Sequence, residues 1–261
     1  MKIGFISDIH EDIVRLREAI AILEKQNCNK IVCLGDFIGY SVPFYGFLNS
    51  RNGHEVISVI QEKCDLVVAG NHELYEVRKL PRYNAGFNYP KNWYELDYWK
   101  RKELSKGKVN LYEHDELSPL ITKKDEKYIE KLPEYILANF DGIKILLSHW
   151  TYPDLSGSLT FNPEKPEDFT EHFEFMKKQG CNLSIQGHDH RRIMCFSPNK
   201  FHEISFGTKI KLTDKPLGIY CPCIANGTFA NGLMILDTNK KELEIIPLNT
   251  QIHKAPDWRK L

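Results

Sequence analysis

The stretch KIGFISDIH at residues 2–10 joins a short apolar run to two side chains that can bind a metal ion, Asp8 and His10. Residues 11–29 follow, with apolar residues at helical spacing and charged residues between them. These apolar residues are Ile13, Leu16, Ile20 and Leu23. The apolar run KIVCL comes next, at residues 30–34. A strand, a helix and a strand in this order predict a βαβ unit, and therefore a parallel sheet with right-handed crossovers.

Four more apolar runs of the chain end in small, polar residues, as the first one does. The five resulting blocks are Asp8-Ile9-His10, Gly35-Asp36-Phe37-Ile38-Gly39, Gly70-Asn71-His72-Glu73, Ser148-His149 and Gly187-His188-Asp189-His190. Ligands of open α/β sheets bind outside the carboxyl ends of the strands, so we expect the five blocks to lie together. The ligand candidates among them are two carboxylates, one amide and four imidazoles. This set suits two divalent transition-metal ions such as Mn, Fe, Ni or Zn better than calcium or magnesium alone.

The blocks carry little information singly, because short motifs recur by chance and a lone histidine is more often structural than a ligand. Taken together, in this order and each after an apolar run, they resemble the calcineurin-like metallophosphoesterase superfamily over nearly the whole chain. The resemblance implies an α/β fold, a four-layer α/β/β/α sandwich of two mixed sheets flanked by helices, with a dinuclear metal site. We accordingly expect one such domain at residues 1–261, with a helical insert at about residues 74–131.

The resemblance also implies roles for the site residues. One ion would be held by Asp8, His10, Asp36 and His190, and the other by Asp36, Asn71, His149 and His188, with Asp36 bridging the two. His72 would face the scissile phosphate without binding a metal ion and would assist the leaving group. Asn71 would also offset charge on the phosphate. As contacts to the substrate we expect Arg191 and Trp150.

Within the superfamily, the sequence GDFIGYSVP at residues 35–43 and the insert that ends at Leu132-Pro133 are similar to a branch of small bacterial phosphodiesterases. Asn226-Gly227-Thr228 matches that branch loosely. The implied reaction is hydrolysis of a phosphodiester by a hydroxide that bridges the two metal ions, with Mn favoured in an assay. Two departures are Glu73, where many relatives have Asp, and Trp150, where a glycine often follows the histidine.

Other functions stay open at the level of the sequence. A phosphomonoesterase would use the same site, whereas a protein phosphatase is disfavoured because GDFIGY lacks the acidic-arginine extension of that class. A non-catalytic scaffold with this fold is disfavoured because every ligand position is filled. A nuclease would need a basic groove, of which the balanced charge gives no sign.

Composition narrows the class of partner. The 261 residues include 35 Lys and Arg and 35 Asp and Glu, so the net charge of zero gives no reason to expect a nucleic acid or a membrane surface. The expected partner is a small phosphate ester such as a nucleotide.

The N-terminus and the cysteines indicate the compartment. The N-terminus lacks the apolar core of a signal peptide and the seven cysteines show no disulfide framework, so we expect a cytoplasmic protein. Five of the cysteines lie in or beside apolar runs and are typical of buried positions. Cys221-Pro-Cys223 looks more like a metal or redox pair, an interpretation disfavoured because no second Cys/His pair lies at zinc-finger spacing.

The second half of the chain is rich in expected strands. YILANF and IKILLS predict a hairpin across Asp141-Gly142. A helix with Phe169, Phe173 and Met176 on one face separates this hairpin from further strands. The runs that predict these strands are NLSIQ, RIMCF, HEISF, CIANG, GLMILD and ELEIIPL. For the aromatic residues of the insert, core packing is the first interpretation, and a second is that Tyr83, Tyr89 and Trp93 wall the substrate pocket.

Overall fold

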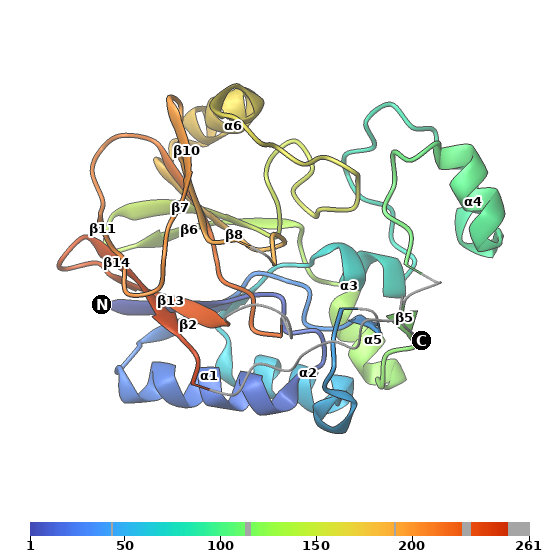
Figure 1. Cartoon of the computed structure of the whole chain (residues 1–261), viewed down its shortest axis with the longest axis horizontal. Coiled ribbons are helices and arrows are strands. Elements are labelled where there is room, and N and C mark those ends of the chain that lie inside the picture. Colours follow the sequence, from blue (N-terminus) through green and yellow to red (C-terminus); the bar gives the residue numbers. More distant parts are fainter. Residues whose placement is uncertain (43, 113–115, 191, 226–230, 250–261) are drawn as a thin grey trace.

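The computed structural model of the chain describes residues 1–42, 44–112, 116–190, 192–225 and 231–249. Two six-stranded sheets of this described chain lie face to face, with helices on the outer face of each (Figure 1). The four-layer α/β/β/α sandwich expected from the sequence is thereby confirmed. Within the described residues, no helix combines the length and the apolar composition that a membrane-spanning segment needs.

The first sheet has the strand order β11-β14-β13-β1-β2-β4. Its strands are β1 (Lys2–Ile6), β2 (Lys30–Cys33), β4 (Leu66–Val67), β11 (Lys209–Lys211), β13 (Gly232–Asp237) and β14 (Glu242–Pro247). β1, β2 and β4 are parallel, which confirms the βαβ prediction, and β13 pairs antiparallel with both β1 and β14. The outer face is covered by α1 (Ile13–Lys25) and α2 (Gly53–Lys63) (Figure 1). Each helix begins at a side chain that accepts a hydrogen bond from its first turn, Asp12 for α1 and Asn52 for α2.

The second sheet has the strand order β10-β9-β12-β8-β7-β6. Its strands are β6 (Tyr135–Phe140), β7 (Ile143–Ser148), β8 (Leu183–Gln186), β9 (Met194–Ser197), β10 (Lys200–Glu203) and β12 (Leu217–Tyr220). β8 pairs parallel with β7 and β12, and the other pairs are antiparallel. The predicted β6–β7 hairpin is confirmed, and Asp141 and Gly142 in its turn both have positive φ. The turn η3 (Pro166–Phe169) and helix α6 (Thr170–Gln179) lie on the outer face (Figure 1).

Several details of the strand prediction are wrong. The run HEISF overlaps β10 only at its first two residues, because β10 begins earlier, at Lys200. Cys223–Ala225 of CIANG are not in a strand, and Asn226-Gly227-Thr228 lie outside the described residues. β12 was not expected, since Gly218 lowers the strand signal of LGIY. Gly218 is required at this position because the Phe196 ring packs against it. A Cβ added to Gly218 would lie 2.0 Å from Phe196 Cζ.

The layer between the two sheets is the apolar core that joins them. Ile3 and Phe5 of β1 face Ile145 and Ile185 of the second sheet, and all four side chains are fully buried. Burying such a side chain stabilises the fold by about 1.5–3 kcal/mol. Between them, Gly4 faces the other way, where a Cβ would lie 2.4 Å from the Leu23 side chain of α1. The alternation along β1 therefore places one face against the second sheet and the other against α1.

The segment between the two halves adds short elements beside the sheets. They are α3 (Asn71–Glu76), η2 (Trp93–Glu95), α4 (Tyr98–Ser105), β5 (Glu116–Leu117) and α5 (Lys123–Ile129). β5 pairs antiparallel with β3 (Tyr40–Ser41), which directly follows the GDFIG block and precedes the turn η1 (Leu48–Ser50). α4 lies far from both sheets, whereas α5 packs beside α3 (Figure 1). The segment is thus tied to the rest of the chain close to GDFIG.

The aromatic residues of this segment mostly pack against one another. Trp93 is buried, and its ring lies 5.3 Å from that of Phe87 and 5.2 Å from that of Tyr89. Tyr83 is exposed. These side chains form a small core of their own, which favours the interpretation of the insert aromatics as packing residues.

His172 of α6 connects this helix to β8 through a neutral imidazole. Its Nδ1 accepts a hydrogen bond of 3.0 Å from the Tyr152 backbone N–H, so the ring hydrogen lies on Nε2, 2.8 Å from Ser184 Oγ. A hydrogen on Nδ1 as well would place two hydrogen-bond donors, this one and the Tyr152 N–H, against each other. Burial lowers the pKa of His172 from 6.5 to about 3. The neutral ring is therefore the form that the folded chain holds.

We expect His172 to make the fold less stable in acid. Because the folded pKa is depressed, its contribution is complete above pH 6.5 and decreases by about 1.4 kcal/mol per pH unit as the pH falls towards 3. The free energy of unfolding of wild type and of His172→Gln, measured by urea titration between pH 7 and pH 4, should converge as the pH falls. A difference that stays constant over this range would show that His172 does not titrate as a buried neutral group.

Candidate metal centre

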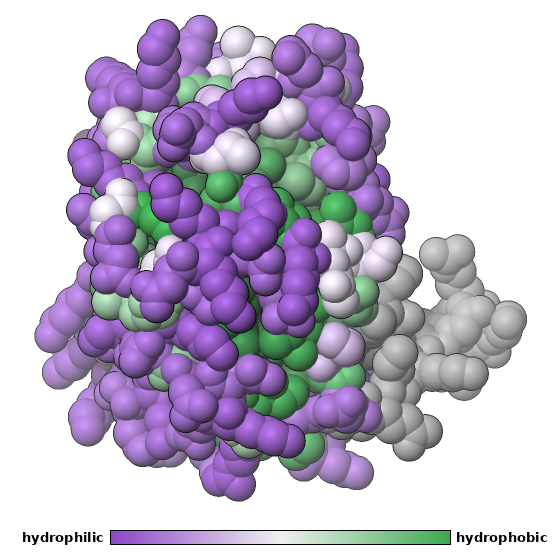
Figure 2. Space-filling view, turned by 90° about the vertical axis from the view of Figure 1, so that its left-hand side faces the viewer, coloured by the Kyte–Doolittle hydropathy of each residue, from purple (hydrophilic) through white to green (hydrophobic). Residues whose placement is uncertain are grey.

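The five blocks lie at the carboxyl ends of strands from both sheets. Asp8 and His10 follow β1, Asp36 follows β2, Asn71 and His72 open α3 after β4, His149 follows β7, and His188 and His190 follow β8. The structure therefore brings together residues that are up to 182 positions apart in the chain, as in the pair of Asp8 and His190. The opposite side of the molecule, at the N-terminus, is mostly hydrophilic surface (Figure 2).

The donor atoms form two groups that share one carboxylate. In each group they lie within 4.8 Å of one another, and the groups are Asp8, His10, Asp36 and His190, and Asp36, His149 and His188. In the first, His190 Nε2 is 2.9 Å from Asp8 Oδ1 and 3.2 Å from His10 Nε2. In the second, His149 Nε2 is 3.0 Å from Asp36 Oδ2 and 3.2 Å from His188 Nδ1. Two buried His/Asp clusters of this kind match a dinuclear metal site.

Backbone carbonyls fix the direction in which two of the imidazoles present their lone pairs. His10 Nδ1 donates a hydrogen bond of 2.7 Å to the Gly39 carbonyl, and His149 Nδ1 donates one of 2.8 Å to the Leu34 carbonyl. A carbonyl only accepts, so each Nδ1 carries a hydrogen and each Nε2 is the ring nitrogen that can bind a cation. Such outer hydrogen bonds are the usual way in which metal-binding histidines are oriented.

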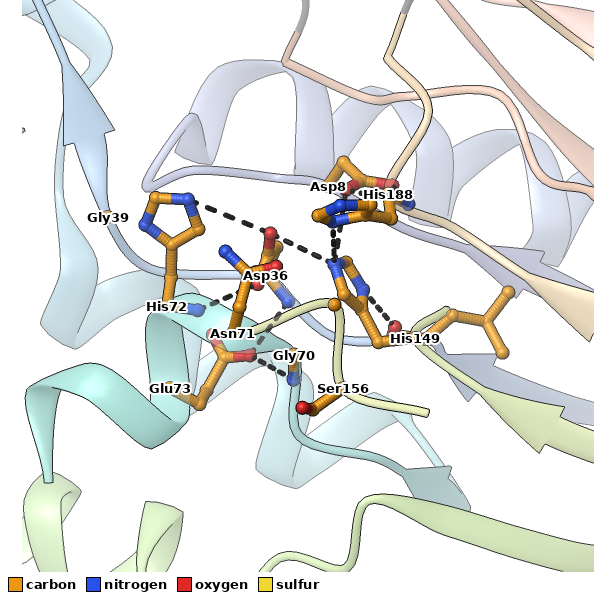
Figure 3. A network of polar contacts seen from close by, with 12 residues as sticks. Asp8, Asp36, Gly39, Gly70, Asn71, His72, Glu73, His149, Ser156 and His188 are labelled. Atoms are coloured by element: carbon orange, nitrogen blue, oxygen red, sulfur yellow. Dashed lines mark hydrogen bonds and ion pairs between the residues drawn. The ribbon is translucent and has the colours of Figure 1, made fainter. Parts of the chain in front are cut away.

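Asn71 offers an oxygen that the protein itself leaves without a partner. Its amide Nδ2 donates a hydrogen bond of 2.7 Å to the Tyr112 hydroxyl, which fixes the orientation of the amide. Its Oδ1 is buried and has no hydrogen-bond partner among the described residues. Asn71 lies beside Asp36 in the centre (Figure 3). A buried orphaned carbonyl costs free energy unless a ligand satisfies it, and a cation at the second cluster would do so.

The electrostatics of the centre suit cation binding. Burial alone would raise the pKa of Asp36, but the imidazoles of His149 and His72 outweigh it and hold that pKa well below its usual range. Burial, aided by His149, lowers the pKa of His188 to about 3. For His149 the opposite holds: burial lowers its pKa, but Asp36 outweighs burial and raises the value to about 9. A metal ion that binds His149 therefore displaces a proton.

Glu73 supports the loop that carries Asp36. Its carboxylate accepts hydrogen bonds of 2.7–3.1 Å from four backbone N–H groups, those of Asp36, Phe37, Ile38 and Gly70. Burial and the nearby Asp36 raise the pKa of Glu73 to about 7, against the opposing effect of these bonds. The sequence marks Glu73 only as a departure from many relatives. Its position three residues after Gly70, the residue that precedes the first residue of α3, is the signal that predicts a capping role.

His72 faces the centre without belonging to either cluster. Its backbone N–H donates to Asp36 Oδ1 over 3.1 Å, and its Nε2 lies 3.8 Å from Asp36 Oδ2 (Figure 3). On the other side of the ring, Nδ1 lies 2.8 Å from Oε1 of Glu116. Burial disfavours the charged ring, but Glu116 and Asp36 outweigh it and raise the pKa of His72 to about 10. The sequence contains no periodic signal that would have found Glu116.

A cavity of about 620 Å³ opens above the metal centre. Its floor includes His72, His188 and His190, and its walls include Phe44, Tyr45, Tyr112 and Trp150. The Trp150 ring is buried 4.6 Å from that of His188, so the structure places this predicted substrate contact at the wall of the cavity. Tyr83, Tyr89 and Trp93 do not line it. Arg191, the other predicted contact, lies outside the described residues, while its neighbour Arg192 lines the cavity and pairs with Asp189 over 3.3 Å.

Cys221 and Cys223 lie behind the centre as buried structural side chains. Cys223 Sγ donates to the Asp8 carbonyl over 3.2 Å, and Cys221 Sγ donates to the Phe5 carbonyl over 3.6 Å. Burial raises the pKa of the Cys221 thiol well above its usual range. Neither belongs to the clusters found among the described residues.

A family model described as calcineurin-like phosphoesterase matches residues 1–192 of the 261. The chain belongs to this family. The resemblance drawn from the five blocks is therefore confirmed at the level of the superfamily. The matched region includes every predicted metal ligand, since the last of them is His190.

The chain is also similar, at low sequence identity, to individual proteins. The uncharacterized protein MJ0912 of Methanocaldococcus jannaschii is 25% identical over 197 residues, which cover 72% of this chain and 62% of the relative. This chain thus matches less than two thirds of the length of that relative. A metallophosphoesterase from Sphaerobacter thermophilus has a TM-score of 0.65 at 15% identity, over 96% of this chain and 89% of its own. The hypothetical protein PH1004 from Pyrococcus horikoshii has a TM-score of 0.56 at 10% identity, over 96% and 88%. Both structures share the fold.

Proposed function

We propose that this chain hydrolyses phosphate esters, phosphodiesters before monoesters, with two divalent transition-metal ions in the candidate metal centre. The observation that supports this most directly is the pair of buried clusters that share Asp36 on the floor of a cavity. One ion would be held by Asp8, His10, Asp36 and His190, and the other by Asp36, Asn71, His149 and His188. When bound, two such ions lower the pKa of a water molecule and offset the charge of phosphate oxygens.

The protein groups around the ions would orient the ester and help the leaving group. His72 Nε2 faces the centre from outside both clusters, so we assign it the donation of a proton to the leaving oxygen. Trp150 would limit the cavity on the side of His188. Arg191 is proposed as a contact to the phosphate because of its place beside His190 in the sequence.

The size of the cavity favours a phosphodiester with two sizeable groups over a small phosphate monoester. Its volume of about 620 Å³ lies in the range of pockets that take ligands much larger than one phosphate group. Phe44 is 63% exposed at its wall, which suits a substrate with an apolar or aromatic group such as a nucleotide. A phosphomonoesterase is the second candidate, since the same centre would serve it. The scaffold interpretation loses support because each expected ligand side chain is present at the centre.

The test is hydrolysis of bis(p-nitrophenyl) phosphate beside p-nitrophenyl phosphate by protein stripped of metal. Mn, Ni, Zn and Mg are added separately, and metal content is measured on the same samples. We expect diester turnover that depends on Mn or another transition metal, because the donor set is rich in nitrogen. Faster turnover of the monoester would make the protein a phosphatase. Two bound ions without turnover of either ester would contradict the proposal and favour a scaffold.

A further inference from the structure

We infer that Glu116, a residue of the segment 74–131, is the positioning residue that holds His72 towards the leaving group. Its carboxylate Oε1 lies 2.8 Å from His72 Nδ1. Both side chains are largely buried, with 12% of Glu116 and 10% of His72 exposed. The inference rests on the proposed function, because it assigns Glu116 a task in that same reaction.

The fold delivers Glu116 to this place through a short strand pair. Glu116 opens β5, and its register partner is Ser41 of β3. Ser41 lies two residues after Gly39, the last residue of the block that contains Asp36. Beyond β5, Arg51 donates a hydrogen bond of 3.4 Å to the Leu117 carbonyl and forms an ion pair of 3.0 Å with Glu11. The strand that carries Glu116 is therefore anchored to the same loops that carry the metal-binding residues.

The surroundings of the His72 ring leave it one orientation. Tyr112 packs on its face, with ring centroids 4.6 Å apart, and His10 meets it edge-on at 4.9 Å. Gly39 closes the slot near Nδ1: a Cβ at this position would lie 2.1 Å from that atom, and its φ of +83° also disfavours other residues. Because Nδ1 lies 2.8 Å from Glu116 Oε1, the Nε2 atom is the one on the side of Asp36, 3.8 Å from its Oδ2.

This orientation determines how a proton moves. A carboxylate accepts but cannot donate when ionised, so it keeps a hydrogen on Nδ1 and leaves Nε2 to serve the reaction. When the bond from phosphorus to the leaving oxygen breaks, its electron pair stays on that oxygen, which takes the proton from Nε2. The proton that the attacking water loses restores the ring, so the cycle is balanced. Glu116 touches neither substrate nor metal in this scheme and acts only through His72.

The experiment compares wild type, Glu116→Gln, His72→Ala and the double variant on two methyl aryl phosphodiesters, one releasing p-nitrophenol and the other phenol. His72→Ala should lower kcat by about 10²- to 10⁴-fold for the phenyl ester. Glu116→Gln should lower kcat for the phenyl ester by about 10- to 100-fold. Its effect on the p-nitrophenyl ester should be smaller, because p-nitrophenolate leaves with little proton donation. KM and metal content should not change. In the His72→Ala background, Glu116→Gln should have no further effect.

Glu103→Gln is the matched control, because it removes the same charge from an exposed residue of the same segment. Glu116→Asp should recover part of the lost rate, and it replaces Glu116→Gln if the latter does not fold. A wild type inactive on both esters contradicts the proposed function itself. An active wild type in which Glu116→Gln equals Glu103→Gln, or slows both esters equally, contradicts the role of Glu116 alone. Additive losses in the double variant would also overturn it.

Discussion

Asp36→Asn is expected to remove at least one of the two metal ions and to lower kcat/KM by about 10³-fold or more. Among the described residues, Asp36 is the side chain shared by both clusters. Its Oδ2 lies 3.0 Å from His149 Nε2, and its Oδ1 accepts the His72 backbone N–H. Asparagine has the same shape but only one neutral oxygen, and its NH₂ group would point hydrogens at a cation. The loss is therefore electrostatic and not steric.

The measurement is the metal content per chain after dialysis, by mass spectrometry of the metals, with kcat/KM on the same samples. Asp141→Asn is the matched control. Asp141 has the same φ of 50° as Asp36, but it lies partly exposed in the β6–β7 turn and pairs with the N-terminus. That variant should keep both ions and full activity. Two ions per chain in Asp36→Asn would contradict the shared-ligand assignment.

The layout of the centre could be predicted from the sequence because strand ends position its residues. Parallel strands of one sheet end at a common edge, so polar residues after KIGFI and KIVC have to meet. The same holds for β7 and β8, which place His149 beside His188. Apolar runs are visible in a sequence, and the residue that follows each run is known by counting. The assignment of these residues to two ions that share Asp36 came from the family resemblance and not from this counting.

The contacts that orient the histidines could not be predicted in this way. Glu116 lies in a strand of two residues, too short for any periodic pattern, and reaches His72 only through its pairing with β3. Tyr45 and Tyr112 likewise reach His10 and His72 from loops. The sequence instead drew attention to Tyr89 and Trp93, which pack among themselves. Residue type and spacing do not state the direction in which a side chain leaves a loop.

Glu73 supplies the acceptors for the backbone N–H groups of the loop after β2. Asp36 has positive φ, which is uncommon for a residue other than glycine, and three consecutive N–H groups of its loop point inwards. Both carboxylate oxygens of Glu73 accept two N–H donors each, one pair from Phe37 and Ile38 and the other from Asp36 and Gly70. One buried side chain thereby satisfies donors from two of the five blocks.

We therefore expect substitutions of Glu73 to destabilise the fold in a fixed order. Glu73→Ala orphans four buried donors, each worth about 1–3 kcal/mol, and should lower the free energy of unfolding by about 4 kcal/mol or more. Glu73→Gln keeps one oxygen and turns an NH₂ group against two donors, so its loss should be about half as large. Glu73→Asp keeps all acceptors on a shorter arm and should cost least. Urea unfolding of the three variants tests the order. If glutamine were tolerated as well as aspartate, the second oxygen would not be what holds the Asp36 loop.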